Sequence, residues 1–255
     1  MTLTLTPIPG LPMVQPGDNL ADMLMIGLAR AGLNLEDGDI LVLAQKIVSK
    51  AEGRLVNLAA VRPSDRALEL ADRAEKDPRV MELVLQESRE VLRVRPGSVI
   101  VEHRLGFVCA NAGIDHSNVA GEGNHVEEWV LLLPVDPDDS ANNVRKELES
   151  ASGCRLGVMI IDSHGRAWRL GVAGIAIGLS GMPALVDLRG QPDLLGYTLR
   201  HTTIGVADEL AAGASLVMGQ AAEGTPAVHV RGFPYPLREG NLRELLRPHE
   251  QDMFR

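Results

Sequence analysis

The stretch F-V-C-A-N-A-G-I-D-H-S-N, from Phe107 to Asn118, decides how the rest of the chain is interpreted. Its short apolar run is typical of a β-strand, and the run ends abruptly in small and polar residues. Gly113 lets the backbone turn where a side chain would clash. Asp115 then begins a run of carboxylate, imidazole, hydroxyl and amide side chains. Such a strand end is typical of a binding site, but an Asx-turn at Asp115 explains the same pattern.

A second stretch, R-L-G-V-M-I-I-D-S from residue 155 to residue 163, has the same character. It predicts an apolar strand that ends in the carboxylate of Asp162 beside the hydroxyl of Ser163. Two strand ends that each offer an aspartate and a small oxygen donor suit a hard cation such as Mg²⁺ or Mn²⁺. Such metals usually bridge protein carboxylates to substrate phosphates. The hypothesis requires that Asp115 and Asp162 lie close together in the fold.

Length and composition indicate an ordinary globular protein. The chain has 255 residues, of which 45% are hydrophobic and 23% charged, enough for one large domain or two small ones. No apolar run approaches the roughly 20 residues needed to span a bilayer, and the N-terminus lacks the pattern of a signal peptide. Cys109 and Cys154 match no metal-binding or redox spacing. We therefore expect no membrane partner and a location in the reducing cytoplasm.

Charge and aromatic content argue against nucleic acid as a partner. The net charge is −9, from 34 acidic and 25 basic residues, so polyanion binding is disfavoured. The three Phe, two Tyr and two Trp residues are too few for a base-stacking platform. An acidic protein that binds a small phosphorylated substrate would need metal ions to offset the repulsion between its own negative charge and the phosphate. This need agrees with Asp115 and Asp162 as candidate metal ligands.

Local periodicity and capping signals predict a mixture of helices and strands. Strands are expected over 4–8, 40–43, 98–102, 107–109, 129–133, 155–163 and 227–232. Helices are expected over 20–31, 63–94, 203–219 and 241–247, and after the capping cluster Asp138, Asp139 and Ser140, for which capping explains the carboxylates better than a metal does. Because helices and strands intermix without strict alternation, the pattern favours an α+β fold with mixed sheets over a doubly wound α/β fold.

The strand at 40–43 leads to a polar stretch that contains Gln45, Lys46, Ser49 and Lys50. Two lysines and a serine at a strand exit could hold phosphates as point charges and donors. A solvated polar turn explains the stretch equally well. No glycine-rich Walker A cradle precedes the lysines, and no G-x-G-x-x-G stands between a strand and a helix. A nucleotide would therefore bind outside the familiar loop types.

Several stretches, taken in order, resemble the coenzyme F420:L-glutamate ligases, the gamma-glutamyl ligases of the deazaflavin coenzyme. The matching stretches are G-L-P at Gly10, Q-K-I-V-S-K-A-E-G-R at Gln45, N-A-G-I-D-x-S-N at Asn111, I-I-D-S-H-G-R at Ile160, G-V-A-G-I-A-I-G at Gly171, A-D-E at Ala207 and P-A-V-H-V-R-G at Pro226. Each is weak alone, but the ordered set covers nearly the whole chain. Some bacterial relatives carry an additional nitroreductase-like domain after this region. The resemblance predicts a single ligase domain over residues 1–255 without it.

The resemblance implies GTP-dependent ligation of L-glutamate to F420-0 and then to the growing tail, through an acyl phosphate with release of GDP and phosphate. It also implies a homodimer with a mixed-sheet fold particular to the family. Mg²⁺ or Mn²⁺ is the expected metal, with K⁺ as a further candidate cation. The alternative is a GTP-binding regulatory or scaffold protein without ligase activity. Retention of both aspartate-bearing strand ends favours the enzyme, since GTP binding alone could tolerate their loss.

The same resemblance implies roles for individual residues. Its catalytic residues are Asp115, Asp162 and Lys50, and its metal ligands are Asp115, Asp162, Ser163 and Gln220. The expected GTP contacts are Leu11, Pro12, Met13, Val14, Gln45, Lys46, Lys50, Asn118 and the loop Met218, Gly219, Gln220, Ala221, Ala222, Glu223, Gly224 and Thr225. Ser163 replaces a threonine that is common in relatives and supplies the same hydroxyl. Gln220 stands where relatives often have a carboxylate, so we expect a second metal bound more weakly, with Glu223 as partial substitute. His116 or His164 could accept the proton of the glutamate amine.

Overall fold

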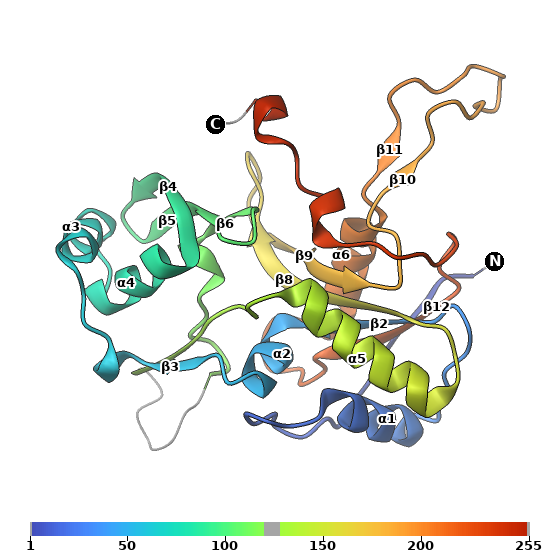
Figure 1. The fold of residues 1–255 in the computed structure, drawn as a ribbon, viewed down its shortest axis with the longest axis horizontal. Coiled ribbons are helices and arrows are strands. Elements are labelled where there is room, and N and C mark those ends of the chain that lie inside the picture. The colour runs from blue at the N-terminus through green and yellow to red at the C-terminus, as the bar shows by residue number, and fades with distance from the viewer. Residues whose placement is uncertain (1, 120–127, 254–255) are drawn as a thin grey trace.

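A five-stranded mixed sheet forms the centre of the molecule (Figure 1). The structure is a computed structural model and describes residues 2–119 and 128–253. The strands lie in the order β1 (Thr4–Pro7), β12 (Ala227–Arg231), β2 (Ile40–Ala44), β8 (Gly157–Gly165) and β9 (Val172–Ser180). β2 and β8 run parallel, whereas the other neighbours run antiparallel. This arrangement confirms the predicted α+β fold with mixed sheets.

Helices cover both faces of this sheet. The helices α1 (Leu20–Arg30) and α5 (Pro137–Ser152) lie on one side, and α6 (Val206–Met218) lies on the other (Figure 1). In β2, Leu41 and Leu43 join the buried cluster on the α1 and α5 side, while Ile40 and Val42 join the cluster beneath α6. A strand covered on both faces is apolar at every position. The continuous apolar run in β2 is therefore buried on both faces.

A smaller antiparallel sheet packs beside the central one. It consists of β4 (Ser88–Arg95), β5 (Ser98–His103) and β6 (Val108–Ala110), with α3 (Asp65–Ala74) and α4 (Pro78–Glu87) against it. The strands predicted over 98–102 and 107–109 form β5 and β6, which pair as an antiparallel hairpin. The continuous helical pattern over 63–94 is wrong beyond Glu87, where the chain becomes β4. Pairing with β5 decides this, because a strand's stability depends on its neighbours more than on local preference.

Short elements complete the described chain. They are α2 (Gln45–Ala51), β3 (Leu55–Asn57), β7 (Trp129–Leu131), β10 (Val186–Asp187), β11 (Thr203–Ile204) and the 3₁₀ turns η1 (Leu58–Ala60), η2 (Asn111–Gly113), η4 (Leu242–Glu244) and η5 (His249–Gln251). The tail helix predicted over 241–247 is wrong, because only the turn η4 forms there. β10 and β11 begin an arm that projects from the body (Figure 1). Within the described residues, no helix is long and apolar enough to cross a membrane.

A buried carboxylate ties β12 to the beginning of β2. Asp39 is 1% exposed and accepts hydrogen bonds from His229 Nε2 at 2.8 Å and from Arg231 Nη2 at 2.7 Å. Burial alone would raise the pKa of Asp39, but the hydrogen bonds from Arg231 and His229 outweigh it and lower the pKa. This cluster holds β12 beside β2. It therefore also fixes the relative positions of the loop that precedes β12 and of the residues that follow β2.

Candidate active site

Parallel pairing of β2 and β8 brings the two predicted regions together. Ala44 of β2 lies opposite Ile161 of β8, so Gln45 and Asp162 follow at the same edge of the sheet. In sheets with parallel strands, ligands commonly bind just outside the carboxyl ends of those strands. One correction concerns β8, which continues to Gly165 and does not end at Asp162.

Asp115 reaches this edge from the segment that follows η2. Its backbone forms an isolated bridge with Leu131, with N–O distances of 3.0 and 2.9 Å. Gly113, two residues earlier, has φ +66°, and a Cβ there would lie 2.7 Å from Leu133 Cδ1, so glycine is required as predicted. The alternative of an Asx-turn does not account for the Asp115 side chain, because Gln45 Nε2 donates to its Oδ2 at 2.7 Å.

The two aspartates are close enough to influence each other. Burial raises the pKa of Asp115, and the negative charge of Asp162 raises it further. The ammonium of Lys46, 3.3 Å from Asp115 Oδ2, opposes this rise. The described structure therefore concentrates two carboxylates and a cation at one edge of the sheet, as the metal-site hypothesis requires.

The lysines lie on a helix, so the solvated-turn alternative is wrong. Residues 45–51 form α2, and Lys50 is only 8% exposed. Lys46 Nζ donates to Ser117 O at 3.0 Å and to Ser117 Oγ at 2.8 Å, while Lys50 Nζ donates to Asn118 O at 2.8 Å. Burial, and then the neighbouring ammonium of Lys46, lower the pKa of Lys50. Both lysines thus hold the segment that carries Asp115.

The loop between α6 and β12 joins the site from the other side. Asn118 Nδ2 donates to Ala221 O at 3.1 Å. Ser163 Oγ donates to Gln220 Oε1 at 2.8 Å, and Gln220 Nε2 donates to Ser215 Oγ at 2.7 Å. Because consecutive strand residues point to opposite sides, Asp162 and Ser163 belong to two separate sets of donors. One is the carboxylate pair, and the other is a hydroxyl with an amide oxygen.

Glu223 folds back onto its own loop. Its Oε2 accepts a hydrogen bond from Ala221 N at 2.8 Å, and Gly219, at φ +76°, has no room for a Cβ because the Glu223 side chain lies against it. Thr225 Oγ1 donates to Met218 O at 2.9 Å and closes the loop. Among the described residues, no hydrogen bond links Glu223 to either aspartate. Its predicted role as a substitute ligand stays a prediction.

The predicted N-terminal nucleotide segment packs against α1. Val14 is buried, Met13 is 69% exposed, and Leu11 lies against Gly27 of α1. The turn that follows is bound to the carboxyl end of α2 through Gly17 N and Ala51 O at 2.8 Å. The turn at Gly17 therefore lies at the end of α2 opposite to Gln45. Contact of residues 11–14 with GTP stays a prediction.

The two histidines differ in position. His116 is exposed and directly follows Asp115. His164 lies on β8 and is only 6% exposed. Its Nε2 lies 3.0 Å from Asp162 Oδ2. A buried histidine bound to a candidate metal ligand is the feature that sequence reasoning missed, and alternation of Asp162 and His164 along one strand face was the signal available.

The donor chemistry suits a hard cation completed by a substrate. Within residues 2–119 and 128–253, no group of three or more His, Cys, Asp and Glu side chains forms a metal cage. The oxygens present are those of Asp115 and Asp162 and, separately, those of Ser163 and Gln220. Mg²⁺ is usually held by one or two carboxylates together with substrate phosphates and water. Two carboxylates without a third are therefore sufficient for that kind of site.

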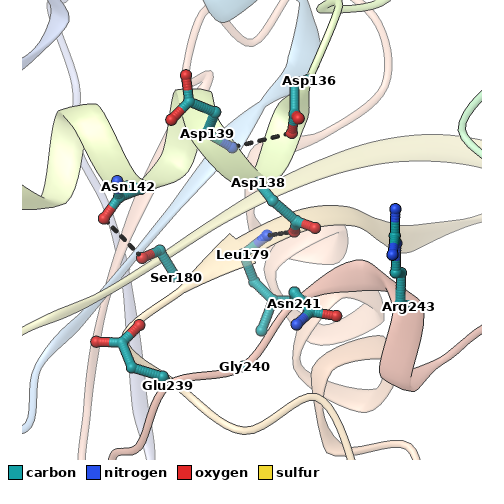
Figure 2. Close-up of a pocket in the computed structure, with 10 residues that line it drawn as sticks. All are labelled: Asp136, Asp138, Asp139, Asn142, Leu179, Ser180, Glu239, Gly240, Asn241 and Arg243. Atoms are coloured by element: carbon teal, nitrogen blue, oxygen red, sulfur yellow. Dashed lines mark hydrogen bonds between the residues drawn. The ribbon is translucent and has the colours of Figure 1, made fainter.

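A separate pocket at the start of α5 is lined by acidic side chains that are already used (Figure 2). Asp136 caps α5 by accepting from Asp139 N at 3.1 Å. Asp138 accepts from Leu179 N at 2.9 Å and from Leu242 N at 3.0 Å, and burial raises its pKa. The predicted helix start is confirmed, but its N-cap is Asp136, which lies outside the predicted cluster of Asp138, Asp139 and Ser140. Asp138 instead accepts hydrogen bonds from backbone groups of β9 and η4.

Comparison with known proteins agrees with the sequence resemblance. A family model described as F420-0:Gamma-glutamyl ligase matches residues 10–232. A protein of Methanothermobacter thermautotrophicus, named coenzyme F420:L-glutamate ligase, is 46% identical over 257 residues and is matched over 100% of both chains. Proteins of the same name from Methanopyrus kandleri and Archaeoglobus fulgidus are 46% and 43% identical, with 100% of this chain and 98% and 97% of theirs covered.

Proposed function

Because the chain belongs to the F420-0:gamma-glutamyl ligase family, we propose that it joins L-glutamate to F420-0 in a GTP-dependent reaction through an acyl phosphate. Ligation of glutamate to F420 follows from the family and from three relatives of one name matched over nearly their full length. The nucleotide and the intermediate are our proposal. The observation that carries it is the pair Asp115 and Asp162, brought together at one sheet edge next to Lys46.

The chemistry of amide formation explains why such a site is needed. A carboxylate is a poor acylating agent, so it must be activated before an amine can attack it. In the proposed first step, a carboxylate oxygen of F420-0 takes the γ-phosphoryl group of GTP, and GDP leaves. The glutamate nitrogen then attacks the acyl carbon and forms the amide bond. The bond from the acyl carbon to the phosphate oxygen breaks, phosphate leaves with the electron pair of that bond, and the nitrogen loses a proton. Phosphoryl transfer depends mainly on positioning and on neutralising charge.

The residues divide these tasks between them. Asp115 and Asp162 would hold Mg²⁺ or Mn²⁺, and Ser163 with Gln220 would hold a second ion more weakly, because neutral oxygens are weaker ligands than carboxylates. The bound metal supplies neutralisation of charge on the phosphoryl group. Lys46 and Lys50 on α2 would add positive charge, and the Lys46 ammonium lies 3.3 Å from Asp115 Oδ2. K⁺ stays a prediction.

The proton of the attacking amine needs an acceptor at the surface of the site. His164 is buried and is bound to Asp162, whereas His116 is exposed and adjacent to Asp115. A general base must reach the proton that it removes. Of the two histidines predicted for this role, His116 is therefore our choice.

We also propose a homodimer, as the resemblance implies. The arm beyond β10 supports an association, since Leu194 and Leu195 at its end are fully exposed. Large exposed apolar side chains that lie together often mark an interface with another protein. Sedimentation of the chain and of a variant with both leucines changed to serine would test it. A monomeric wild type would refute the proposal.

Mass spectrometry of the products tests the activity directly. F420-0, GTP, Mn²⁺ and glutamate are incubated with the chain, and we expect a product heavier by one glutamyl unit. Release of GDP should require both F420-0 and glutamate for turnover. A nucleotide-binding protein without ligase chemistry would give no heavier product. Product formed with GTP left intact would refute the GTP dependence and keep the ligation.

A further inference from the structure

His164 stands in direct contact with one of the two site carboxylates. It lies two residues after Asp162 in β8, so both side chains point to the same side of the strand. Its Nε2 is 3.0 Å from Asp162 Oδ2. Within the described residues, no other side chain forms a hydrogen bond with Asp162. Asp115, by contrast, is held by Gln45 and Lys46.

The surroundings of His164 determine which nitrogen carries the proton. The Nδ1 atom is buried and has no hydrogen-bond partner among the described residues. The ring lies against Phe107, with ring centroids 5.2 Å apart and planes inclined by 55°. An ionised carboxylate only accepts hydrogen bonds, so the Nε2 next to Asp162 must be the donor. In the neutral ring, Nδ1 is then left as an unused acceptor in an apolar environment.

A buried polar atom without a partner destabilises the fold, and an apolar ring would fill this space without that penalty. The hydrogen bond to Asp162 is the compensating contact that the described structure offers. It engages one oxygen of the carboxylate and leaves the other for a ligand. Groups that hold a metal ligand in orientation strongly affect metal affinity.

We propose that His164 is a positioning residue that fixes the Asp162 carboxylate in the orientation needed to bind the metal. This inference rests on the proposed metal site. His164 would then orient the Asp162 carboxylate through a hydrogen bond, as Gln45 orients that of Asp115. His164 does not exchange a proton with substrate in this role, because its Nε2–H is directed at Asp162 and its Nδ1 is buried.

Three variants separate this role from simple core packing. His164→Phe keeps a buried ring but removes the donor, and His164→Gln keeps an N–H donor on a side chain of similar reach. His103→Phe is the matched control, because His103 is also buried, at 2% exposed, and packs against the same Phe107 ring that His164 contacts. The ring centroids of His103 and Phe107 are 5.2 Å apart. Burial, and then neighbouring positive charges, lower the pKa of His103 to about 4, so the control removes no charge near pH 7.

The measurement is Mn²⁺ binding, followed by electron paramagnetic resonance, with thermal unfolding as the check on folding. We expect His164→Phe to weaken Mn²⁺ binding by roughly 10- to 100-fold, the range for loss of such holding groups. His164→Gln should recover most of the affinity, and His103→Phe should match the wild type. Saturating Mn²⁺ should restore the turnover of His164→Phe, because the defect lies in affinity.

Each outcome decides one question. Wild-type affinity in a folded His164→Phe variant would overturn the positioning role and leave the proposed function intact. Equal losses in folded His164→Phe and His164→Gln would also overturn it, since the retained donor would then not matter. Failure of the wild type to bind Mn²⁺ would overturn the metal site of the proposed function and this inference with it. That result is visible before any variant is made.

Discussion

Replacing Lys50 by methionine tests whether this buried ammonium serves the nucleotide or only the fold. Methionine keeps much of the apolar stem and removes the charge and the donor. The lost bond is the one from Nζ to Asn118 O at 2.8 Å. Water can replace the lysine at that carbonyl, because Asn118 is exposed, and burial already lowers the pKa of Lys50. The free energy of unfolding should therefore fall by no more than about 1 kcal/mol.

The expected loss of GTP affinity is larger. A hydrogen bond to a charged group contributes about 1.5–3 kcal/mol, which corresponds to a roughly 10- to 150-fold change in dissociation constant. Titration calorimetry with GTP, together with urea unfolding, measures both quantities. Lys146→Met, on the exposed face of α5, is the matched control and should change neither.

A third variant, Lys50→Gln, separates charge from bracing. Its amide can still donate to the Asn118 carbonyl, but it carries no charge. If the charge binds phosphate, this variant loses GTP affinity as Lys50→Met does. Recovery of affinity by glutamine would mean that the side chain only braces the loop. Unchanged affinity in both variants would refute the reasoning and remove Lys50 from the proposed site.

The other predictions concern the carboxylates and the loop before β12. Asp115→Asn and Asp162→Asn should each abolish ligation while thermal unfolding stays near that of the wild type, and near-normal turnover at saturating Mn²⁺ in either variant would contradict the two-carboxylate site. Gln220→Glu should tighten the second Mn²⁺ and Glu223→Gln should weaken it, so three indistinguishable titrations would assign the loop to GTP alone. Asp39→Asn should lower the free energy of unfolding by about 3 kcal/mol at pH 7, near the lower limit for breaking a buried ion pair. The pKa of Asp39 is lowered in the folded state, so its contribution to the free energy of unfolding is present above the unfolded pKa of roughly 3.9 and is lost as pH falls through the folded value. The difference in unfolding free energy between Asp39→Asn and the wild type should therefore shrink in acid. A difference that stays constant with pH would argue against the ion pair.

Much of the fold followed from local patterns. The alternating and continuous apolar runs predicted β2, β5, β8 and β12, because burial on one or both faces of a sheet leaves a direct mark on the sequence. The helical pattern over 63–94 contains both α3 and α4, and Asp77 caps the start of α4. The segment from Ser88 to Val94 was predicted wrongly as helix, since its pairing with β5 depends on residues that local periodicity does not include.

The candidate site was only partly predictable. The sequence by itself determined which side chains were suited to the chemistry, and the ordered motifs determined the family. Only the tertiary structure decided that Asp115 and Asp162 lie close together, that Lys50 is buried on a helix, and that His164 holds Asp162. The parallel pairing of β2 with β8 joins strands that are more than a hundred residues apart. Contacts of that range arise from backbone hydrogen bonding and burial of the whole sheet, which no short stretch of sequence records.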